Sequence, residues 1–275
     1  MEYELIADET SVKFWSDVRL PFEPKGDVRA MRDVLRVALA RLRGPRLRAS
    51  FGGIAGAAFD IENVLFYNVG CSAFRGCAQT ELYFERRFAP AMAPSGRAWL
   101  WSHEYRIDEL CKSWAPSGHK AELRLSGNGA IPTTAAEYWR AAHLARSGDG
   151  QRLSVSAPLF LSLQLSSPRP VNLTEAVKKV TDGICSALHS YEGSRLEAVA
   201  ARAATSLQVS PAVATEWLTR HGALGPRQFV WPYRQSLQWS PADERLVAVE
   251  MSWSPSGSNA WTMAVELSGA EPTAP

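Results

Sequence analysis

The spacing of apolar and polar residues predicts helices and strands along the first third of the chain. Residues 11–22 are rich in aromatic and β-branched side chains, which predicts a strand. Apolar residues then recur every three or four positions over 27–43, which predicts a helix with one buried face. The continuous apolar run 64–67 and the alternating segment 79–88 predict two further strands. The expected order is therefore strand, helix, strand, strand.

The same order returns near the end of the chain. Residues 156–170 predict a strand and 172–193 predict a capped helix. Two more strands are expected at 238–253 and 260–267. In both parts, acidic residues come directly before the third element. This repetition predicts an α+β protein in which two βαββ-like halves share one mixed sheet.

The middle of the chain predicts further strands, one helix and a boundary. A Thr134/Glu137 capping box marks the start of the helix, and the polar segment after this helix is the best candidate for a linker. We therefore expect an N-terminal half over 1–148 and a C-terminal half over 149–275. Two short helices over 194–222 interrupt the second half, with the rhythm of a helix-turn-helix or of a helical hairpin packed on the sheet. A Ser194/Glu197 capping box predicts the start of the first, and Ser210-Pro211 predicts the start of the second.

Composition narrows the class of protein. The 275 residues are 46% hydrophobic and 21% charged, as in ordinary globular proteins, and the formal net charge is only +2. Any nucleic-acid surface must therefore be a local patch. The four cysteines lack the CxxC spacing of zinc sites, no apolar run reaches the roughly 18 residues of a membrane helix, and the first residues do not resemble a signal peptide. We expect a cytoplasmic protein without membrane contact.

The clearest local anomaly in charge is a group of arginines in and after the first predicted helix. Guanidinium groups bind phosphates through two parallel hydrogen bonds, so this group predicts a surface for DNA or RNA. An acidic protein partner and a plain solvated helix face are the alternatives. The six candidate residues are Arg29, Arg32, Arg36, Arg43, Arg46 and Arg48.

A second candidate site rests on carboxylates. Asp60 and Glu62 are two residues apart, so on a strand their side chains point to the same side and could share a Mg or Mn ion. A further ligand must come from elsewhere in the chain, and Asp182 and Asp243 are the candidates. The alternative interpretation is architectural, because acidic residues also solvate the start of a buried strand. The matching position of the acidic pair Asp243-Glu244 favours this second interpretation.

A polar stretch starts the predicted helix of the second half. In that helix Lys178 and Asp182 lie one turn apart, and Asp243-Glu244 opens a later strand. With this spacing the region is similar to the RusA-like family of Holliday-junction endonucleases, whose pattern is D-x-D-N-L-x-K-x-x-x-D. The family's leading aspartates and its asparagine are replaced here by Asn172, Thr174 and Glu175. The similarity covers 156–190 and 238–252. It implies a nucleic-acid-binding fold with a lost or relocated metal site.

The leading prediction is a protein that binds nucleic acid or a nucleoprotein assembly through the arginine-bearing helix, without robust catalysis. A divalent-metal-dependent nuclease is the first alternative, with Mg or Mn held by the carboxylates above. A structural subunit of a protein complex, which docks other proteins through its basic helix and tryptophan-rich surfaces, is the second.

Overall fold

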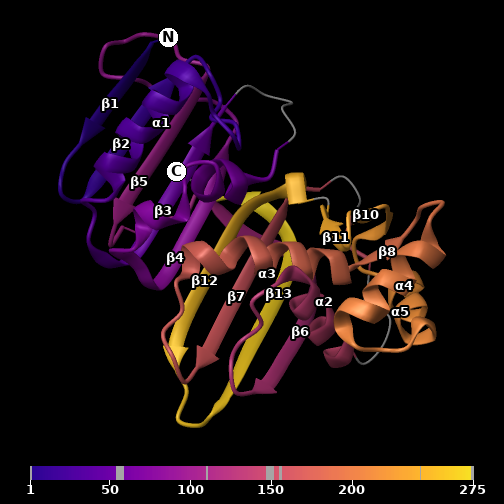
Figure 1. Cartoon of the computed structure of the whole chain (residues 1–275). Coiled ribbons are helices and arrows are strands. Elements are labelled where there is room, and N and C mark those ends of the chain that lie inside the picture. Colours follow the sequence, from indigo (N-terminus) through magenta and orange to yellow (C-terminus); the bar gives the residue numbers. More distant parts are fainter. Residues whose placement is uncertain are drawn as a thin grey trace.

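One large mixed sheet forms the centre of the protein. The computed structural model describes residues 2–53, 59–109, 111–146, 152–154, 157–241 and 243–273. In these residues nine strands pair in the order β1-β2-β5-β3-β4-β12-β7-β13-β6 (Figure 1). The α+β class and the mixed sheet are therefore confirmed. The strands are β1 (Tyr3–Ala7), β2 (Ser11–Ser16), β3 (Gly44–Gly52), β4 (Cys77–Arg87), β5 (Trp101–Ile107), β6 (Trp114–Asn128), β7 (Leu159–Ser167), β12 (Leu246–Pro255) and β13 (Ala260–Pro272).

Helices cover one face of this sheet (Figure 1). The opposite face, which we call the open face, is covered in part by segments without a helix, such as the one in which Ala93 and Trp99 pack against Trp15 of β2. The elements on the helical face are α1 (Gly26–Leu39), η1 (Asn63–Tyr67), η2 (Cys71–Phe74), α2 (Ala135–Ala145) and α3 (Leu173–Ala187). Their apolar side chains share one core with alternate strand residues, such as Leu82 and Phe84 of β4. The residues between these, Tyr83 and Glu85, point to the open face because side chains alternate along a strand.

The strand pairings repeat in two contiguous parts of the chain. In the N-terminal half, β2 pairs antiparallel with β5, β5 antiparallel with β3, and β3 parallel with β4. In the C-terminal half, β6, β13, β7 and β12 follow the same pattern. The halves meet in the middle of the sheet, where β4 and β12 pair antiparallel. The topology is therefore βαβαββ twice, with η1 and η2 in the place that α3 takes in the C-terminal half.

The halves meet earlier along the chain than the sequence predicted. β6 pairs with β13 along its whole length, so the connection between the halves is the segment 108–113 and not the polar segment near residue 148. Residues 147–151 lie outside the described part of the chain. Local sequence pattern misplaces this boundary because the partner of β6 is β13, the last described strand along the chain.

Two elements differ from the sequence-based expectation. The apolar run 64–67 is a π-helix over Asn63–Tyr67 rather than a strand, because a continuous apolar run has no period that separates a strand from a buried helix. β3 forms a central strand of the N-terminal half where the pattern predicts none. The proline and arginines of this segment conceal its strand pattern. In the structure Arg46 and Arg48 are therefore residues of β3.

The predicted helical insertion is confirmed as α4 (Leu196–Leu207) and α5 (Pro211–Thr219). The hydroxyl of Ser210 caps α5, whereas Arg195 rather than Ser194 is the N-cap of α4 and makes no side-chain cap bond. Two small sheets accompany these helices, formed by β8 (His189–Tyr191) with β9 (Gly225–Arg227) and by β10 (Val230–Tyr233) with β11 (Ser236–Trp239). Across the described ranges, no helix is long and apolar enough to cross a membrane.

Candidate functional site

Three of the six candidate arginines bind groups of this protein, although only Arg48 is buried while Arg43 and Arg46 are exposed. Arg48 is buried on β3, and its Nη2 donates to Oε1 of Glu85 at 2.7 Å. Arg46 forms an ion pair with Asp108 at 3.3 Å. Arg43 donates to backbone carbonyls just before it, at 2.6 and 2.7 Å. Burial therefore removes Arg48 from any phosphate-binding surface, whereas Arg43 and Arg46 stay exposed with part of their donors already occupied.

The other three arginines lie on α1, on the flank that faces η2. Arg36 donates to the hydroxyl of Ser72 at 3.2 Å, which fixes this flank against the η2 segment. Asp33 lies 3.7 Å from Arg32 and 3.6 Å from Arg36, so part of the positive charge is compensated. Arg29 is exposed.

An exposed pair of aromatic rings borders these arginines. Phe22 lies in the turn before α1, and its ring stacks on Tyr67 at the end of η1, with centroids 5.1 Å apart and planes 3° apart. The two side chains are 56% and 48% exposed. A hydrogen bond from Asn68 to the carbonyl of Leu20, at 2.8 Å, holds the two segments together. We call Phe22, Arg29, Arg32, Arg36 and Tyr67 the α1 surface.

The carboxylates that the sequence singled out converge on one lysine. The Nζ of Lys178, on α3, lies 2.7 Å from Asp182, 3.1 Å from Glu62 and 3.7 Å from Asp60. Asn63 also donates to Asp60 at 2.7 Å. Asp60 and Glu62 belong to the N-terminal half and the other two residues to the C-terminal half. This Lys178 cluster, made of Asp60, Glu62, Lys178 and Asp182, therefore joins the halves on the helical face.

Burial gives the Lys178 cluster unusual electrostatics. Desolvation raises the pKa of Asp182 to about 7, and the charges of Glu62 and Asp60 act in the same direction while Lys178 opposes them. Glu62 is fully buried, and its Oε2 has no hydrogen-bond partner among the described residues. Three carboxylates around one ammonium leave an excess of negative charge, and a proton on Asp182 near neutral pH relieves it.

A lysine ammonium, and not a metal site, is what the three carboxylates surround. Within the described ranges, no group of three or more histidine, cysteine or acidic residues has an arrangement that could hold a metal. The acids before β12 do not join the cluster: Glu244 pairs with Arg227 at 3.0 Å, and the side chain of Asp243 lies outside the described part. Lys178 and Asp182, the matching residues of the RusA-like pattern, thus form an ion pair here.

Other residues of that pattern have a local role at the start of α3. The side-chain oxygen of Asn172 accepts hydrogen bonds from the backbone N–H groups of Thr174 and Glu175, at 3.1 and 3.3 Å. The hydroxyl of Thr174 donates to the same oxygen at 2.8 Å. An asparagine that caps a helix in this way satisfies N–H groups that have no partner within the helix. The predicted cap is therefore confirmed.

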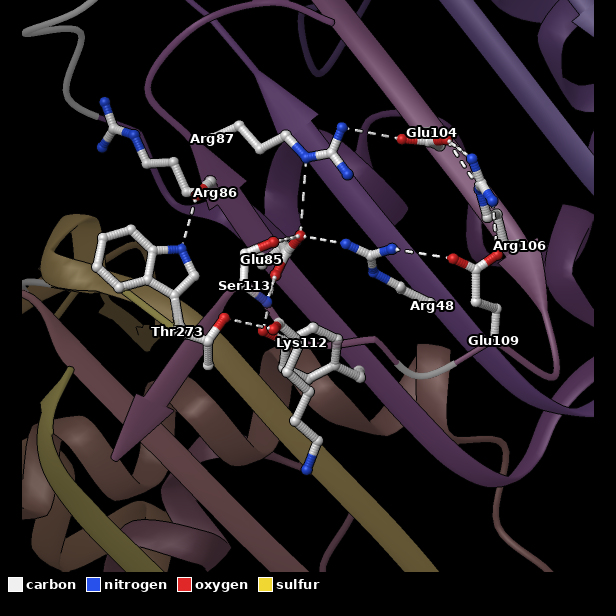
Figure 2. Close-up of polar contacts among 12 residues, drawn as sticks. Arg48, Glu85, Arg86, Arg87, Glu104, Arg106, Glu109, Lys112, Ser113 and Thr273 are labelled. Carbon is white, nitrogen blue, oxygen red and sulfur yellow. Dashed lines mark hydrogen bonds and ion pairs between the residues drawn. The ribbon is translucent and has the colours of Figure 1, made fainter. Parts of the chain in front are cut away.

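A larger polar network, which sequence reasoning missed, lies on the open face of the sheet (Figure 2). Its centre is Glu85 on β4, which is fully buried. Glu85 accepts hydrogen bonds from Arg48, from the hydroxyl of Tyr83, and from both the backbone and the hydroxyl of Ser113, at 2.7 to 2.9 Å. Arg87 lies 3.7 Å away. We call these five residues the Glu85 network.

Further ion pairs extend the Glu85 network toward β5, as Figure 2 shows. Arg87 lies 3.0 Å from Glu104, which in turn lies 2.7 Å from Arg106. Arg106 and Arg48 both approach Glu109, at 2.5 and 3.6 Å. Positive and negative groups alternate, so little uncompensated charge is left to bind an ion.

The role of Glu85 is to fix the segment that connects the two halves. Burial alone would raise its pKa, but the hydrogen bonds from Tyr83, Ser113 and Arg48 outweigh burial and hold the pKa below its ordinary value. Ser113 belongs to the connecting segment, and Trp114 after it donates its indole N–H to the carbonyl of Arg86 at 3.0 Å. A carboxylate with this many donors is a structural anion and not a proton carrier. The sequence signal that could have revealed this network is the alternation of polar and apolar residues in β4.

Comparison with known proteins adds no identity to this geometry. The chain matches no protein-family model, and no curated protein is similar to it at a significant level.

Proposed function

We propose that this protein binds a protein partner through the α1 surface. The observation that carries the proposal is the exposed, stacked ring pair of Phe22 and Tyr67 beside three arginines. Such rings lose their contact with water only when another molecule covers them, and that burial is favourable. Tyrosine and arginine are also among the residue types that contribute most to binding at protein interfaces.

The partner that fits this surface carries carboxylates around an apolar group. Arg29 is exposed, and Arg36 is partly exposed, with 39% of its side chain accessible. Charge pairs at such a rim set the orientation of the partner and its association rate. An apolar side chain of the partner would lie on the rings of Phe22 and Tyr67. The surface of the partner would thus have an apolar centre with an acidic rim.

Two observations favour protein over nucleic acid as the partner. Arg48 is buried, and Arg43 and Arg46 already bind groups of this protein, so fewer guanidinium donors are left for phosphates than the sequence predicts. Asp33 lies beside Arg32 and Arg36 and would repel phosphates approaching them. A mixed surface of this kind suits a folded partner better than a polyanion.

Nucleic acid is the second candidate, because the arginine flank of α1 lies beside flat aromatic rings. Bases of single-stranded DNA or RNA stack on exposed aromatic side chains while cationic groups follow the phosphates. This candidate predicts binding that weakens steeply with salt. It extends the sequence-based expectation to Phe22 and Tyr67.

Affinity capture with the wild-type protein and matched variants as baits tests the proposal. Extract of the source cells is passed over the wild-type protein and over two variants of the α1 surface, Tyr67→Ala and Arg36→Glu. The control variants are Val37→Ala and Arg41→Glu, which change exposed residues elsewhere on or just after α1. We expect a protein that the wild type and both controls retain and that the two α1-surface variants lose. Tyr67→Ala should weaken its affinity roughly 30-fold.

Fluorescence anisotropy with duplex and single-stranded DNA and RNA, at about 50 mM salt and then at increasing salt, tests the second candidate. Salt-dependent binding that Arg36→Glu removes would replace the protein partner by nucleic acid. Identical sets of captured proteins for all five baits would contradict the proposal.

A further inference from the structure

A cavity of about 570 Å³ opens at one end of the C-terminal half. The loops that follow β6 and β7 form its walls, together with the start of α3 and the turn between β12 and β13. β6, β7 and β12 run in the same direction, because β13 is antiparallel to both β6 and β7 and β12 is parallel to β7. The cavity therefore lies beyond the carboxyl ends of three strands, which is where open α/β sheets bind ligands.

The walls of the cavity combine apolar surface with two unengaged cations. Ile131, Pro170 and Val171 contribute apolar surface, and Arg169 and Lys179 contribute positive charge. Within the described part of the chain, neither cation forms a hydrogen bond or an ion pair. Glu175 is the one acidic residue of the lining, so the cavity has a net positive charge. This combination suits a molecule with an apolar body and an anionic group.

A buried hydroxyl gives independent support for a ligand. Tyr138 of α2 lines the cavity and is 1% exposed, and its hydroxyl has no hydrogen-bond partner among the described residues. Burying a hydroxyl without a partner is unfavourable, and such groups are rare in folded proteins. The hydroxyl oxygen itself is covered, so a ligand with an acceptor oxygen removes the penalty only when the side chains that cover the hydroxyl move aside.

The start of α3 does not supply the anion site. Asn172 already accepts hydrogen bonds from the N–H groups of Thr174 and Glu175, so these donors are occupied. The positive groups left for an anion are the side chains of Arg169 and Lys179. Specificity for an anion must therefore come from side chains, which substitutions can test.

At the equivalent end of the N-terminal half, aromatic side chains take the place of the cavity. There Phe59 packs edge-on against Phe51, with centroids 5.0 Å apart, and lies 6.4 Å from the ring of Trp101. The guanidinium of Arg19 lies 5.6 Å from the ring of Phe59. Aromatic rings thus occupy in one half a place where the other half has the cavity. The repeat of topology does not require a cavity, so its presence at Tyr138 is a property of the C-terminal half.

We propose that the cavity binds a small organic anion. Its apolar body lies between Ile131, Pro170 and Val171, its carboxylate or phosphate group contacts Arg169 and Lys179, and an acceptor oxygen takes the hydrogen bond of Tyr138. This proposal is independent of the α1 surface, since the two share no residue.

The first test uses the fluorescent probe 1-anilinonaphthalene-8-sulfonate, an aromatic body with one anionic group. We expect saturable binding to the full chain and at least tenfold weaker binding to the Arg169→Gln/Lys179→Gln double variant. The matched control is Arg195→Gln, an exposed arginine of the helical insertion, which should bind the probe as the wild type does. Decanoate and decyl phosphate should displace the probe, with the tighter of the two identifying the anionic group, and decylamine should not.

The second test separates the hydroxyl of Tyr138 from general packing. Tyr138→Phe removes the unpartnered hydroxyl, so we expect a higher melting temperature without ligand together with weaker probe binding. Tyr83→Phe removes a hydroxyl that donates to Glu85, so we expect a lower melting temperature with unchanged probe binding. Three results would overturn the proposal: no saturable probe binding up to about 1 mM, equal binding by the Arg169/Lys179 variant, or a Tyr138→Phe protein that melts lower and binds equally.

Discussion

Two buried groups of charges join the halves of this protein from opposite faces of the sheet. The Glu85 network lies on the open face and the Lys178 cluster on the helical face. Glu85 and Glu62 are both fully buried. Glu85 accepts four hydrogen bonds from three residues, whereas Oε2 of Glu62 has no partner among the described residues. The pKa of Glu85 falls while that of Asp182, beside Glu62, rises. The number of donors, and not burial alone, decides the charge state.

Removing Glu85 should have the largest effect. Glu85→Ala leaves the buried guanidinium of Arg48 without its carboxylate, so we expect the free energy of unfolding to fall by about 3–5 kcal/mol. Urea denaturation measures it. Glu250→Ala is the control, because Glu250 forms a partly exposed ion pair with Lys112 at 2.6 Å, whose loss should cost less than about 1 kcal/mol. Equal losses in the two variants would show that Glu85 is no more important than a surface charge.

Removing the single cation of the Lys178 cluster should have the next largest effect. Lys178→Met leaves three carboxylates facing one another, and we expect a loss of about 2–3 kcal/mol, reduced from the fully buried case because Lys178 is partly exposed. Lys120→Met, which breaks the exposed pair with Glu266, is the matched control. If Lys178→Met is as stable as the wild type, the cluster does not hold the halves together.

Removing one donor should sharpen the comparison. Tyr83→Phe takes away one of the hydrogen bonds to Glu85 while the ring keeps its packing, so we expect a loss of about 1.5–2 kcal/mol. The same substitution should raise the pKa of Glu85 toward its ordinary value, which a weaker loss of stability on acidification would report. A variant with wild-type stability at every pH would show that the remaining donors suffice.

The smallest effect, taken over a single pH unit near neutrality, is a pH dependence with opposite signs in the two groups. The pKa of Asp182 is raised from 3.8 to about 7, so the folded protein binds more protons than the unfolded chain between these values. The stability that Asp182 contributes is therefore present below about pH 4 and is lost as the pH rises through 7, by about 1 kcal/mol between pH 6 and 7. The lowered pKa of Glu85 acts oppositely, since its contribution is lost as the pH falls.

Unfolding curves of the wild type and of Asp182→Asn, compared across pH 4 to 8, isolate this term. His143 and His189, whose pKa values burial lowers to about 3 and about 4, destabilise both proteins on acidification and cancel in the difference. A difference that does not change with pH would contradict a raised pKa for Asp182.

Local sequence pattern predicted much of the fold and part of the site. The caps at Thr134, Asn172 and Ser210 are confirmed because a cap depends on residues within one turn. Asp60, Glu62 and Asp182, which the sequence grouped as possible metal ligands, lie around Lys178 instead, and the strand expected after Glu62 is the helical η1.

The sequence pattern could not predict which charged residues pair with one another across the fold. The burial of Arg48 depends on Glu85, which lies two strands later in the chain, and nothing in the arginine-rich segment distinguishes Arg48 from Arg29. The lysine at the centre of the carboxylates was visible only as the Lys178–Asp182 pair of one helix, which is common on surfaces. Long-range pairing of charges is thus the information that local periodicity lacks.

The contiguous halves have a consequence for how the polypeptide can be divided. Every strand of each half comes from one uninterrupted stretch, so a break within 108–113 would yield two fragments with complete βαβαββ topologies. Each fragment would expose one new strand edge, β4 or β12, and unpaired edges seek partners. The two fragments would have to restore the β4–β12 ladder together with the contacts of α3 with β4, η1 and η2, so their reassembly would report on the whole interface between the halves.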